Sequence, residues 1–388
     1  MQVLLLGAGS MGRWAAQTAV TFATVSRLTI ADRACMAAEV VAKQCGPKAQ
    51  ALKLDVTDRP ALLAAMQQHQ VVLNCVGPYY RFGLSTLQAA IEAGCHYLDL
   101  CDDWQPTLQM LALNEMAQQA GITAVIGLGA SPGISNLLAL KLARTLGHVR
   151  QLHTGWRVES AMEQEETEAV NRSQAAVEHW IHQFTGRIVL HEGGVQQMKA
   201  PLEPVTLPFP GVGARTFYTL GHPEAVTLPR ALPQLQESKN LMHLHAPTLQ
   251  AIAALAAEVN RGALSVEGAA ARLIQQQQAN PAGEAQVSAG AGDVPSLFAW
   301  GEGLLRGQVV RGAIGIRAYP PGGMGGMTGI PLAVGLCLLS KGRLTKRGVF
   351  SPEEAFDPDE FLAEFAHYCT CPAPVAAERL VYLITSGV

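Results

Sequence analysis

The chain has 388 residues, 49% of them hydrophobic and 15% charged, which allows large buried cores and favours two domains over one. The formal net charge is −3, and no long basic segment is present, which argues against a nucleic-acid partner. The eight cysteines form no C-x-x-C pair, and the apolar segments are shorter than the ~18 residues of a membrane span. We therefore expect a cytoplasmic protein with reduced thiols, no secretion signal and no membrane partner.

A glycine-rich turn lies between the first predicted strand and the first predicted helix. Residues 3–6 are a short apolar segment that indicates a strand, and the pattern G-x-G-x-x-G follows it. Gly7 permits a tight turn, Gly9 leaves no Cβ where the backbone must approach a pyrophosphate, and Gly12 lets the helix pack closely on the strand. The N–H groups at the helix start then face the phosphates. The predicted pyrophosphate-binding residues are Gly7, Gly9, Ser10, Met11 and Gly12.

An acidic residue ends the second predicted strand, residues 27–31. Asp32 stands twenty residues after Gly12, which is the position of the acid that binds the ribose, so strand, spacing and acid together predict a dinucleotide site. A carboxylate accepts hydrogen bonds from the ribose 2′-OH and repels a 2′-phosphate, so we expect an NAD(P) cofactor with NAD(H) favoured. Arg33 follows directly and would bind the 2′-phosphate if Asp32 turned away.

The third predicted strand, residues 51–54, leads into two acidic residues. In nucleotide-binding sheets such a strand end is a natural place for the backbone and a carboxylate to meet the adenine. Asp55 and Val56 are therefore candidate cofactor-binding residues. The alternative for both acids is to cap the helix that begins near Pro60, and we expect this role for Asp58.

The fourth predicted strand, residues 71–76, is apolar on both faces and ends in a glycine-proline loop with two tyrosines. Open parallel sheets bind ligands at the carboxyl ends of their strands, so this loop should lie beside the ribose and nicotinamide end of the cofactor. We expect Tyr79 to touch the substrate as well, and Tyr80 to be a packing residue. The cofactor-binding residues expected here are Cys75, Val76, Gly77 and Tyr79.

Two further strands end in candidate functional loops. The fifth, residues 95–100, is followed by Asp102 and Asp103, of which we expect one to cap the next helix and the other to face the ligand. The sixth, residues 122–128, leads through a glycine-rich loop into a helix that ends near Leu146. The N-terminus of this helix points towards the same edge of the sheet.

Four segments of the first 145 residues resemble the saccharopine dehydrogenase family. They are the G-x-G-x-x-G start and the sequences NCVGPYYRFG, GCHYLDLCDD and GASPGISNLLALKLA, in the order and spacing of that family. The resemblance to saccharopine reductases and lysine 6-dehydrogenases implies hydride transfer at a carbon of an amino-acid or imine substrate, which alternates between imine and amine. It also implies a homodimer formed through the second domain. Saccharopine reductases typically carry an acid where this chain has Ser131.

Two other functions stay open at this stage. The trans-acting enoyl reductases share the N-terminal domain and a HYLDL-like fifth strand, and an apolar cleft with few carboxylate-binding arginines would favour them. A non-catalytic NAD(P)-binding sensor would keep the glycine motif and would dispense with polar groups in the second domain.

From residue 149 the sequence becomes β-rich, which predicts a second domain. Its segment GHPEAVTLPR is predicted to be a loop that gathers His222, Glu224 and Arg230. The planar fork of Arg230 suits a substrate carboxylate, and His222 suits proton exchange with a nitrogen near neutral pH. The alternative is a structural ion pair within the domain.

The remaining segments complete the predicted architecture. Residues 246–278 suggest two helices, and residues 304–318 a hairpin with its turn at Gly307 and Gln308. A glycine-rich stretch then breaks the chain before an apolar helix over 330–339, and the resemblance implies a return to the first domain there.

These patterns predict an α/β fold in three parts. They are a Rossmann-type doubly wound parallel sheet over 1–130, an α+β substrate and dimerisation domain over 131–319, and a C-terminal segment over 320–388 that returns to the Rossmann domain. We predict no metal site, because the acid and histidines on the helix near residue 180 would need further ligands. The candidate catalytic residues are His222, Tyr79, Asp102 and Arg230.

Overall fold

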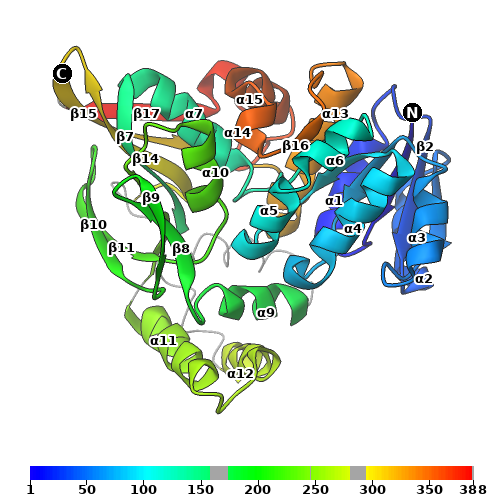
Figure 1. The fold of residues 1–388 in the computed structure, drawn as a ribbon, viewed down its shortest axis with the longest axis horizontal. Coiled ribbons are helices and arrows are strands. Elements are labelled where there is room, and N and C mark those ends of the chain that lie inside the picture. The colour runs from blue at the N-terminus through cyan, green and yellow to red at the C-terminus, as the bar shows by residue number, and fades with distance from the viewer. Residues whose placement is uncertain (158–173, 245, 280–293, 387–388) are drawn as a thin grey trace. The chain divides into compact units, whose positions relative to one another are not determined.

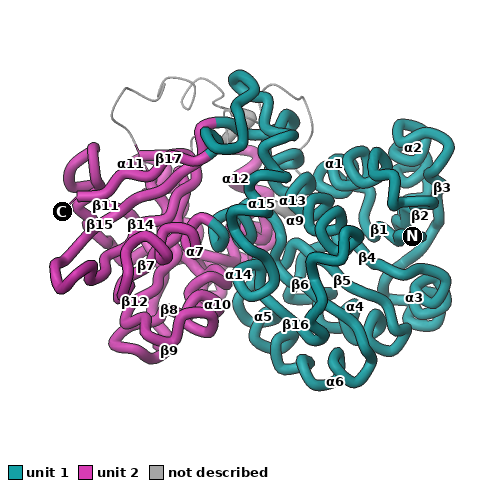
Figure 2. The backbone as a smooth tube through the Cα atoms, turned by 90° about the horizontal axis from the view of Figure 1, so that it is seen from above, with its two compact units in different colours: residues 1–137, 318–380 teal, residues 138–317, 381–388 magenta. Residues whose placement is uncertain are grey.

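The computed structural model (Figure 1) describes residues 1–157, 174–244, 246–279 and 294–386. They divide into two compact units (Figure 2): unit 1 contains Met1–Leu137 and Ala318–Leu380, and unit 2 contains Leu138–Arg317 and the chain from Val381 onward. The last strand departs from the prediction, which assigned all of 320–388 to the first domain. It belongs to unit 2 because it pairs with a strand of that unit's sheet.

Unit 1 is built on a seven-stranded sheet in the order β16-β6-β5-β4-β1-β2-β3, and every pairing in it is parallel. The predicted Rossmann-type sheet is confirmed. Its chain order reverses between β1 and β4, the switch point at which doubly wound sheets bind ligands. The strands are β1 (Gln2–Leu6), β2 (Arg27–Asp32), β3 (Ala49–Lys53), β4 (Val71–Asn74), β5 (His96–Asp99), β6 (Thr123–Val125) and β16 (Gly348–Phe350).

The apolar strands of this sheet are buried, as expected for strands with helices on both faces. Every side chain of β4 is buried, and so are Val3 to Leu6 of β1. Helix α7 (Ile134–Leu146) passes from unit 1 into unit 2. The helices are α1 (Ser10–Ala19), α2 (Cys35–Cys45), α3 (Arg59–Met66), α4 (Tyr79–Ala93), α5 (Trp104–Leu111), α6 (Asn114–Gln119), α13 (Gly323–Ser340), α14 (Pro352–Ala355), α15 (Pro358–Ala366), the 3-10 turn η1 (Ala377–Arg379) and α7 (Ile134–Leu146).

Helix α13 begins earlier than the sequence predicts. The glycine-rich stretch does not break the chain, because α13 starts at Gly323 and includes most of it. Its glycines let the helix lie against α1 at backbone distance. A Cβ on Gly329 would stand 2.1 Å from the carbonyl oxygen of Met11, and one on Gly325 would stand 2.2 Å from Oγ of Ser10. Close helix packing therefore explains glycines that the sequence presents as a chain break.

Helix α13 is also the one described helix that is long and apolar enough to cross a membrane. Most of its residues are buried inside the protein, and it packs on α1 and α15. A helix that is apolar on all sides is expected in the core of a large domain as well as in a membrane. In this structure α13 is a core helix of unit 1.

Unit 2 contains a mixed ten-stranded sheet. Its main path runs β10-β11-β13-β7-β12-β8-β9, and β14, β15 and β17 extend it from β7. The strands are β7 (His148–Arg157), β8 (Ile188–Glu192), β9 (Val195–Lys199), β10 (Pro204–Phe209), β11 (Gly213–Thr219), β12 (Glu237–Ser238), β13 (Asn240–His243), β14 (Leu297–Leu305), β15 (Gln308–Ile316) and β17 (Val381–Ser386). Its helices are α9 (Gln174–His182), α10 (Glu224–Ala231), α11 (Ala246–Asn260) and α12 (Val266–Ala279).

Two segments of unit 2 differ from the sequence-based expectation. The last hairpin begins seven residues earlier than predicted, at Leu297, and its turn residues are Arg306 and Gly307, both with positive φ. The segment predicted as a loop with His222, Glu224 and Arg230 contains α10 from Glu224 onward. Its Pro229 suggested a loop, but tertiary packing overrides that local preference because the residues before it are buried.

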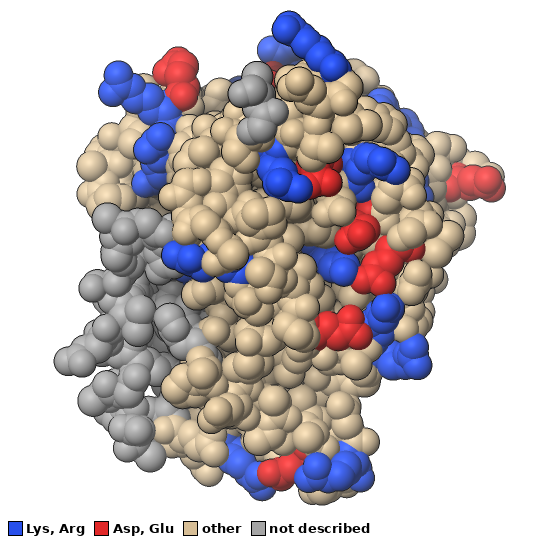
Figure 3. Space-filling model, turned by 90° about the vertical axis from the view of Figure 1, so that its left-hand side faces the viewer, with Lys and Arg blue, Asp and Glu red and all other residues tan. Residues whose placement is uncertain are grey.

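Charged side chains of both signs are interspersed on the face drawn in Figure 3. This pattern fits the small net charge of −3. All eight cysteines are free.

Candidate cofactor and substrate sites

Two glycines of the G-x-G-x-x-G turn are required by the fold itself. Gly7 has φ +92°, and a Cβ there would stand 2.9 Å from the carbonyl oxygen of Cys75. A Cβ on Gly12 would stand 1.9 Å from the carbonyl oxygen of Gly7. These contacts let α1 start directly against the end of β1.

Gly9 is different, because its surroundings within the protein are open. Its backbone is extended, at φ −71° and ψ −172°, and a Cβ there would meet nothing within 4 Å. Gly9 is also the N-cap of α1 and offers no side chain to the free N–H groups of the first turn. The space left at this helix N-terminus fits the pyrophosphate of a dinucleotide.

Asp32 joins the end of β2 to the glycine turn. Its Oδ2 accepts a hydrogen bond from the N–H of Ala8 at 2.8 Å, and its Oδ1 accepts one from the N–H of Ala34 at 2.8 Å. The carboxylate is partly exposed and is held beside the open space at Gly9, as a ribose-binding acid should be. Arg33 is exposed next to it.

The two acidic residues after β3, Asp55 and Asp58, have different surroundings. Asp58 caps α3 by accepting a hydrogen bond from the N–H of Ala61 at 3.1 Å, which confirms its predicted role. Asp55 is exposed, and its Oδ1 accepts hydrogen bonds from both the N–H and the Oγ1 of Thr57. Those bonds lower the pKa of Asp55, so the carboxylate is ionised at neutral pH. Val56 is partly exposed beside it, and contact of the two with the adenine stays a prediction.

The loop after β4 lies against the glycine turn. The N–H of Cys75 donates to the carbonyl of Leu6 at 2.8 Å, and Cγ2 of Val76 stands 3.3 Å from the position of a Cβ on Gly7. A Cβ on Gly77 would meet nothing within 4 Å. The structure therefore brings the residues predicted after β1 and after β4 together at the switch point of the sheet.

Tyr79 is held by backbone groups of the sheet edge. Its hydroxyl donates to the carbonyl of Asn74 at 2.7 Å and accepts from the N–H of Leu100 at 3.2 Å. Burial, with the charge of Asp99 nearby, raises the pKa of Tyr79 well above its ordinary value. Proton exchange with a substrate would break these bonds, so the structure favours a structural role over the predicted catalytic one.

The two acids after β5 have different surroundings. Asp103 is 3% exposed, and its Oδ2 accepts a hydrogen bond from the N–H of Tyr80 at 3.0 Å. It occupies the N-cap position of α5, as predicted for one of the two acids, but its side chain makes no capping hydrogen bond there. Asp102 is partly exposed beyond the carboxyl end of β5, and of the two acids it stays the one predicted to face the ligand.

A buried polar cluster at the same edge was missed by the sequence reasoning. It consists of Asn74, Tyr97 and Asp99, and all three are fully buried. Asn74 and Asp99 are register partners at the ends of β4 and β5. The signal available in the sequence was a polar residue at the end of each of two neighbouring strands, Asn74 and Asp99.

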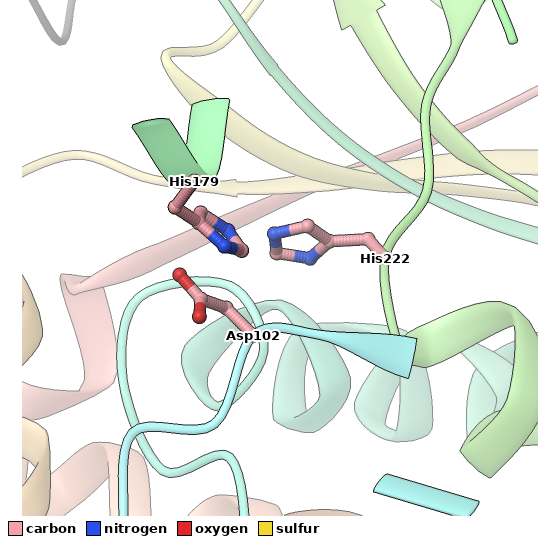
Figure 4. Close-up of side chains that lie close together, drawn as sticks. All are labelled: Asp102, His179 and His222. Atoms are coloured by element: carbon pink, nitrogen blue, oxygen red, sulfur yellow. The ribbon is translucent and has the colours of Figure 1, made fainter. Parts of the chain in front are cut away.

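In unit 2 a buried histidine is paired with a buried carboxylate. Nδ1 of His222 lies 2.9 Å from Oε2 of Glu224, and the two residues are 2% and 0% exposed. The ring of Trp156 on β7 is 4.9 Å from the His222 ring between centroids. Figure 4 shows His179 of α9 facing His222, and their ring centroids are 6.3 Å apart.

Backbone contacts fix the turn that carries this pair. The N–H of Gly221 donates to the carbonyl of Gln183, and the N–H of Ala225 donates to Oδ1 of Asn240, each at 3.0 Å. Nδ1 of His222 faces the carboxylate of Glu224, which fixes the orientation of the imidazole ring. A charged residue with no exposure is rare in a protein core and indicates a functional or a specifying role.

Arg230 is carried by the same helix, α10, as Glu224. It is exposed in the last turn of α10, six residues after Glu224, and a helix rise of ~1.5 Å per residue separates their backbones by roughly 9 Å along the axis. Its binding of a substrate carboxylate stays a prediction.

Replacement of Gly9 by valine should abolish cofactor binding without unfolding the protein. The new side chain has room in the free protein but occupies the pyrophosphate space, so we expect the Kd of NAD(H) and NADP(H) to rise at least about 100-fold. The Tm of the free protein should stay within about 2 °C of the wild type, measured by calorimetry beside fluorescence titration. Gly12→Ala is the contrast, because its Cβ would overlap the Gly7 carbonyl and prevent folding. Normal cofactor binding by Gly9→Val would show that the pyrophosphate lies elsewhere.

Comparison with known proteins identifies the first unit. Residues 3–125 match the family model described as saccharopine dehydrogenase NADP binding domain. Carboxyaminopropylagmatine dehydrogenase of Synechocystis sp. is 24% identical over 397 residues, which cover 94% of each chain. Saccharopine dehydrogenase (NADP+, L-glutamate-forming) of Schizosaccharomyces pombe is 30% identical over 144 residues, 36% of this chain and 29% of the relative.

A solved structure extends the likeness to the whole fold. Apo saccharopine dehydrogenase (L-Glu forming) from Saccharomyces cerevisiae superimposes with a TM-score of 0.61 at 16% identity, covering 100% of this chain and 99% of the other. At that identity the likeness shows a shared fold. Together with the cofactor fit at Gly9 and Asp32, these findings confirm the resemblance seen in the sequence: residues 3–125 form a domain similar to the NADP binding domain of saccharopine dehydrogenases, and the chain shares its fold with one of them.

Proposed function

We propose that the chain catalyses reversible hydride transfer between the nicotinamide and an amine or imine carbon of an amino-acid-type substrate. The observation that carries this proposal is the buried His222–Glu224 pair in unit 2, in a chain whose unit 1 binds NAD(P). Amine and imine differ by a proton on nitrogen as well as by a hydride on carbon, so such an enzyme needs a group that exchanges that proton.

The chain's own residues supply orientation and proton exchange. The bound cofactor would supply the hydride chemistry, with its pyrophosphate at Gly9 and its ribose at Asp32. Glu224 holds one nitrogen of His222, which leaves Nε2 to accept a proton from a substrate ammonium and to return it to the amine in the reverse direction. The ring of Trp156 packs against the imidazole.

The relatives support an amine-type substrate. The carboxyaminopropylagmatine dehydrogenase matches this chain over nearly its whole length, so the likeness includes unit 2. Its name and that of saccharopine dehydrogenase both place the relatives among dehydrogenases of amino compounds. For this chain we propose a substrate with a carboxylate that Arg230 binds and a nitrogen that His222 serves, with Asp102 as a further polar contact.

A substrate screen separates this proposal from its alternatives. NADH or NADPH oxidation is followed with pairs of amines and 2-oxo acids or aldehydes, and with enoyl thioesters in parallel. Turnover with an amine and carbonyl pair supports the proposal, whereas turnover with enoyl substrates alone favours an enoyl reductase. Cofactor binding without turnover on any of them favours the sensor.

We also propose that the protein is a cytoplasmic homodimer with a small-molecule substrate and no nucleic-acid or membrane partner. The free thiols and the small net charge support this proposal. A mass other than twice 41.2 kDa in sedimentation equilibrium would contradict the dimer.

NADH should bind at least about tenfold more tightly than NADPH. The carboxylate of Asp32 accepts hydrogen bonds from a ribose 2′-OH and repels a 2′-phosphate at close range. Fluorescence titration of both reduced cofactors measures the ratio, and Asp32→Asn should shift it towards NADPH because the charge is lost. Tighter binding of NADPH by the wild type would assign the phosphate to Arg33 instead.

His222→Gln should lower kcat/KM by roughly 100-fold or more, the usual contribution of a proton-exchange group. Cofactor binding should be unchanged, because His222 lies in unit 2. The matched control is His191→Gln, which removes another buried histidine of unit 2 and its bond to the carbonyl of Leu235. We expect that variant to lose stability but to keep kcat/KM.

Arg230→Lys tests the carboxylate contact in the same assay. A lysine keeps the charge and loses the bidentate fork, so KM for the substrate should rise while kcat changes less. Equal losses of stability and turnover in His222→Gln and His191→Gln would contradict the assignment of His222.

A further inference from the structure

A single buried carboxylate joins two loops at the carboxyl edge of the unit 1 sheet. Oδ1 of Asp99 accepts the N–H of Cys101 at 3.0 Å, in the loop after β5, and the N–H of Gly127 at 2.8 Å, in the loop after β6. Asp99 is 0% exposed. Both bonds are made by one oxygen of the carboxylate.

The other oxygen reaches a third loop through two side chains. Oδ2 of Asp99 accepts from the hydroxyl of Tyr97 at 2.9 Å, and that hydroxyl accepts from Nδ2 of Asn74 at 2.9 Å. Oδ1 of Asn74 then accepts the N–H of Val76 at 3.0 Å, in the loop after β4. The loops after β4, β5 and β6 therefore share one continuous chain of hydrogen bonds.

The loop at the end of this chain is the one that meets the glycine turn. Val76 packs at Gly7, on the nicotinamide side of the switch point. We propose that Asp99 is a positioning residue for the cofactor: through Tyr97 and Asn74 it sets the loop after β4, and only its ionised form does so. The inference concerns cofactor binding by unit 1 and does not rest on the proposed substrate.

The requirement for the ionised form follows from the donors around the carboxylate. Oδ1 already accepts two N–H groups, so a proton added to Asp99 goes to Oδ2. An Oδ2–H group then faces the hydroxyl proton of Tyr97, and two donors confront each other. Tyr97 has to turn its proton away from Asp99 in a fully buried site, where a hydroxyl proton without an acceptor is costly.

The ionisation of Asp99 falls in an accessible pH range. Burial raises its pKa to about 6, against the three hydrogen bonds that lower it, and Asp102 raises it further. The other titratable groups that face Asp99 are neutral here, since burial raises the pKa of each: Cys75, Tyr79, Tyr97 and Cys101. A pKa raised on folding means that this group stabilises the fold most below about pH 4 and loses that contribution as pH rises through about 6. Affinity for the cofactor should instead be highest above about pH 6, where Asp99 is ionised, and should fall as the pH is lowered.

Asp99→Asn reproduces the protonated arrangement at any pH. The amide oxygen keeps both backbone N–H groups, whereas the NH₂ group confronts the Tyr97 hydroxyl. Tyr97→Phe breaks the same contact by removing the hydroxyl that donates to Asp99. At pH 8 we expect each variant to raise the Kd of NAD+ about tenfold. The Kd of the double variant should not exceed that of the worse-binding single variant, because both substitutions break the same contact between Asp99 and Tyr97.

A control variant distinguishes positioning from general loss of stability. Thr29 is 2% exposed on β2, and its hydroxyl bonds to His69 and to Gln50. Thr29→Val breaks buried hydrogen bonds of the same sheet away from the carboxyl edge. It should lower Tm and leave the Kd of NAD+ within twofold of the wild type.

The pH profile completes the test. NAD+ is the probe because the 2′-phosphate of NADP+ titrates near pH 6 itself. Wild-type affinity should fall as the pH is lowered from 8 to 5, and the affinity of Asp99→Asn should change less over that range. The proposal is overturned if both variants bind NAD+ as the wild type does, if Thr29→Val loses as much affinity, or if Asp99→Asn keeps the full loss at low pH.

Discussion

The close approach of backbone segments around the first helix is the constraint on which the rest of unit 1 depends. Gly7 and Gly12 bring α1 against the end of β1, and Gly325 and Gly329 bring α13 against α1. A methyl group at Gly12 or Gly329 would overlap backbone atoms, and backbone atoms have no other rotamer to adopt. The returning segment of the chain is thus held by the same helix whose N-terminus is the predicted pyrophosphate site.

This packing leaves one glycine with a different purpose. Gly9 has no neighbour that its missing side chain would meet, so the fold does not require a glycine there. A pyrophosphate bound there would require it, because it needs the backbone at close range. The contrast between Gly9 and its two companions separates binding from packing within one motif. It also explains why the motif by itself is weak evidence for a cofactor.

Unit 2 uses burial in another way. A carboxylate with no exposure is costly unless partners compensate it, and His222 is one partner of Glu224. The buried pair lies at a turn that is held by hydrogen bonds from the backbone N–H groups of Gly221 and Ala225. Such a pair holds an imidazole in one orientation and one tautomer, which is what proton exchange with a substrate requires.

The sequence by itself determined the parts that depend on local pattern. Apolar strands, helix periodicity and the spacing from Gly12 to Asp32 predicted the parallel sheet, its order of elements and the dinucleotide site. Asp58 was recognisable as a cap because capping is decided within four residues. The resemblance to the saccharopine dehydrogenase family rested on the same N-terminal segments, and the family model matches residues 3–125.

Only the tertiary structure decided which polar residues are joined. Asn74, Tyr97 and Asp99 become one cluster because β4 and β5 are neighbours in register, and no pattern along the chain records that pairing. The hydroxyl of Tyr79 bridges the ends of β4 and β5 for the same reason. The glycines of α13 suggested a break until α1 supplied the surface they fit, because a glycine's role depends on what lies opposite its missing side chain.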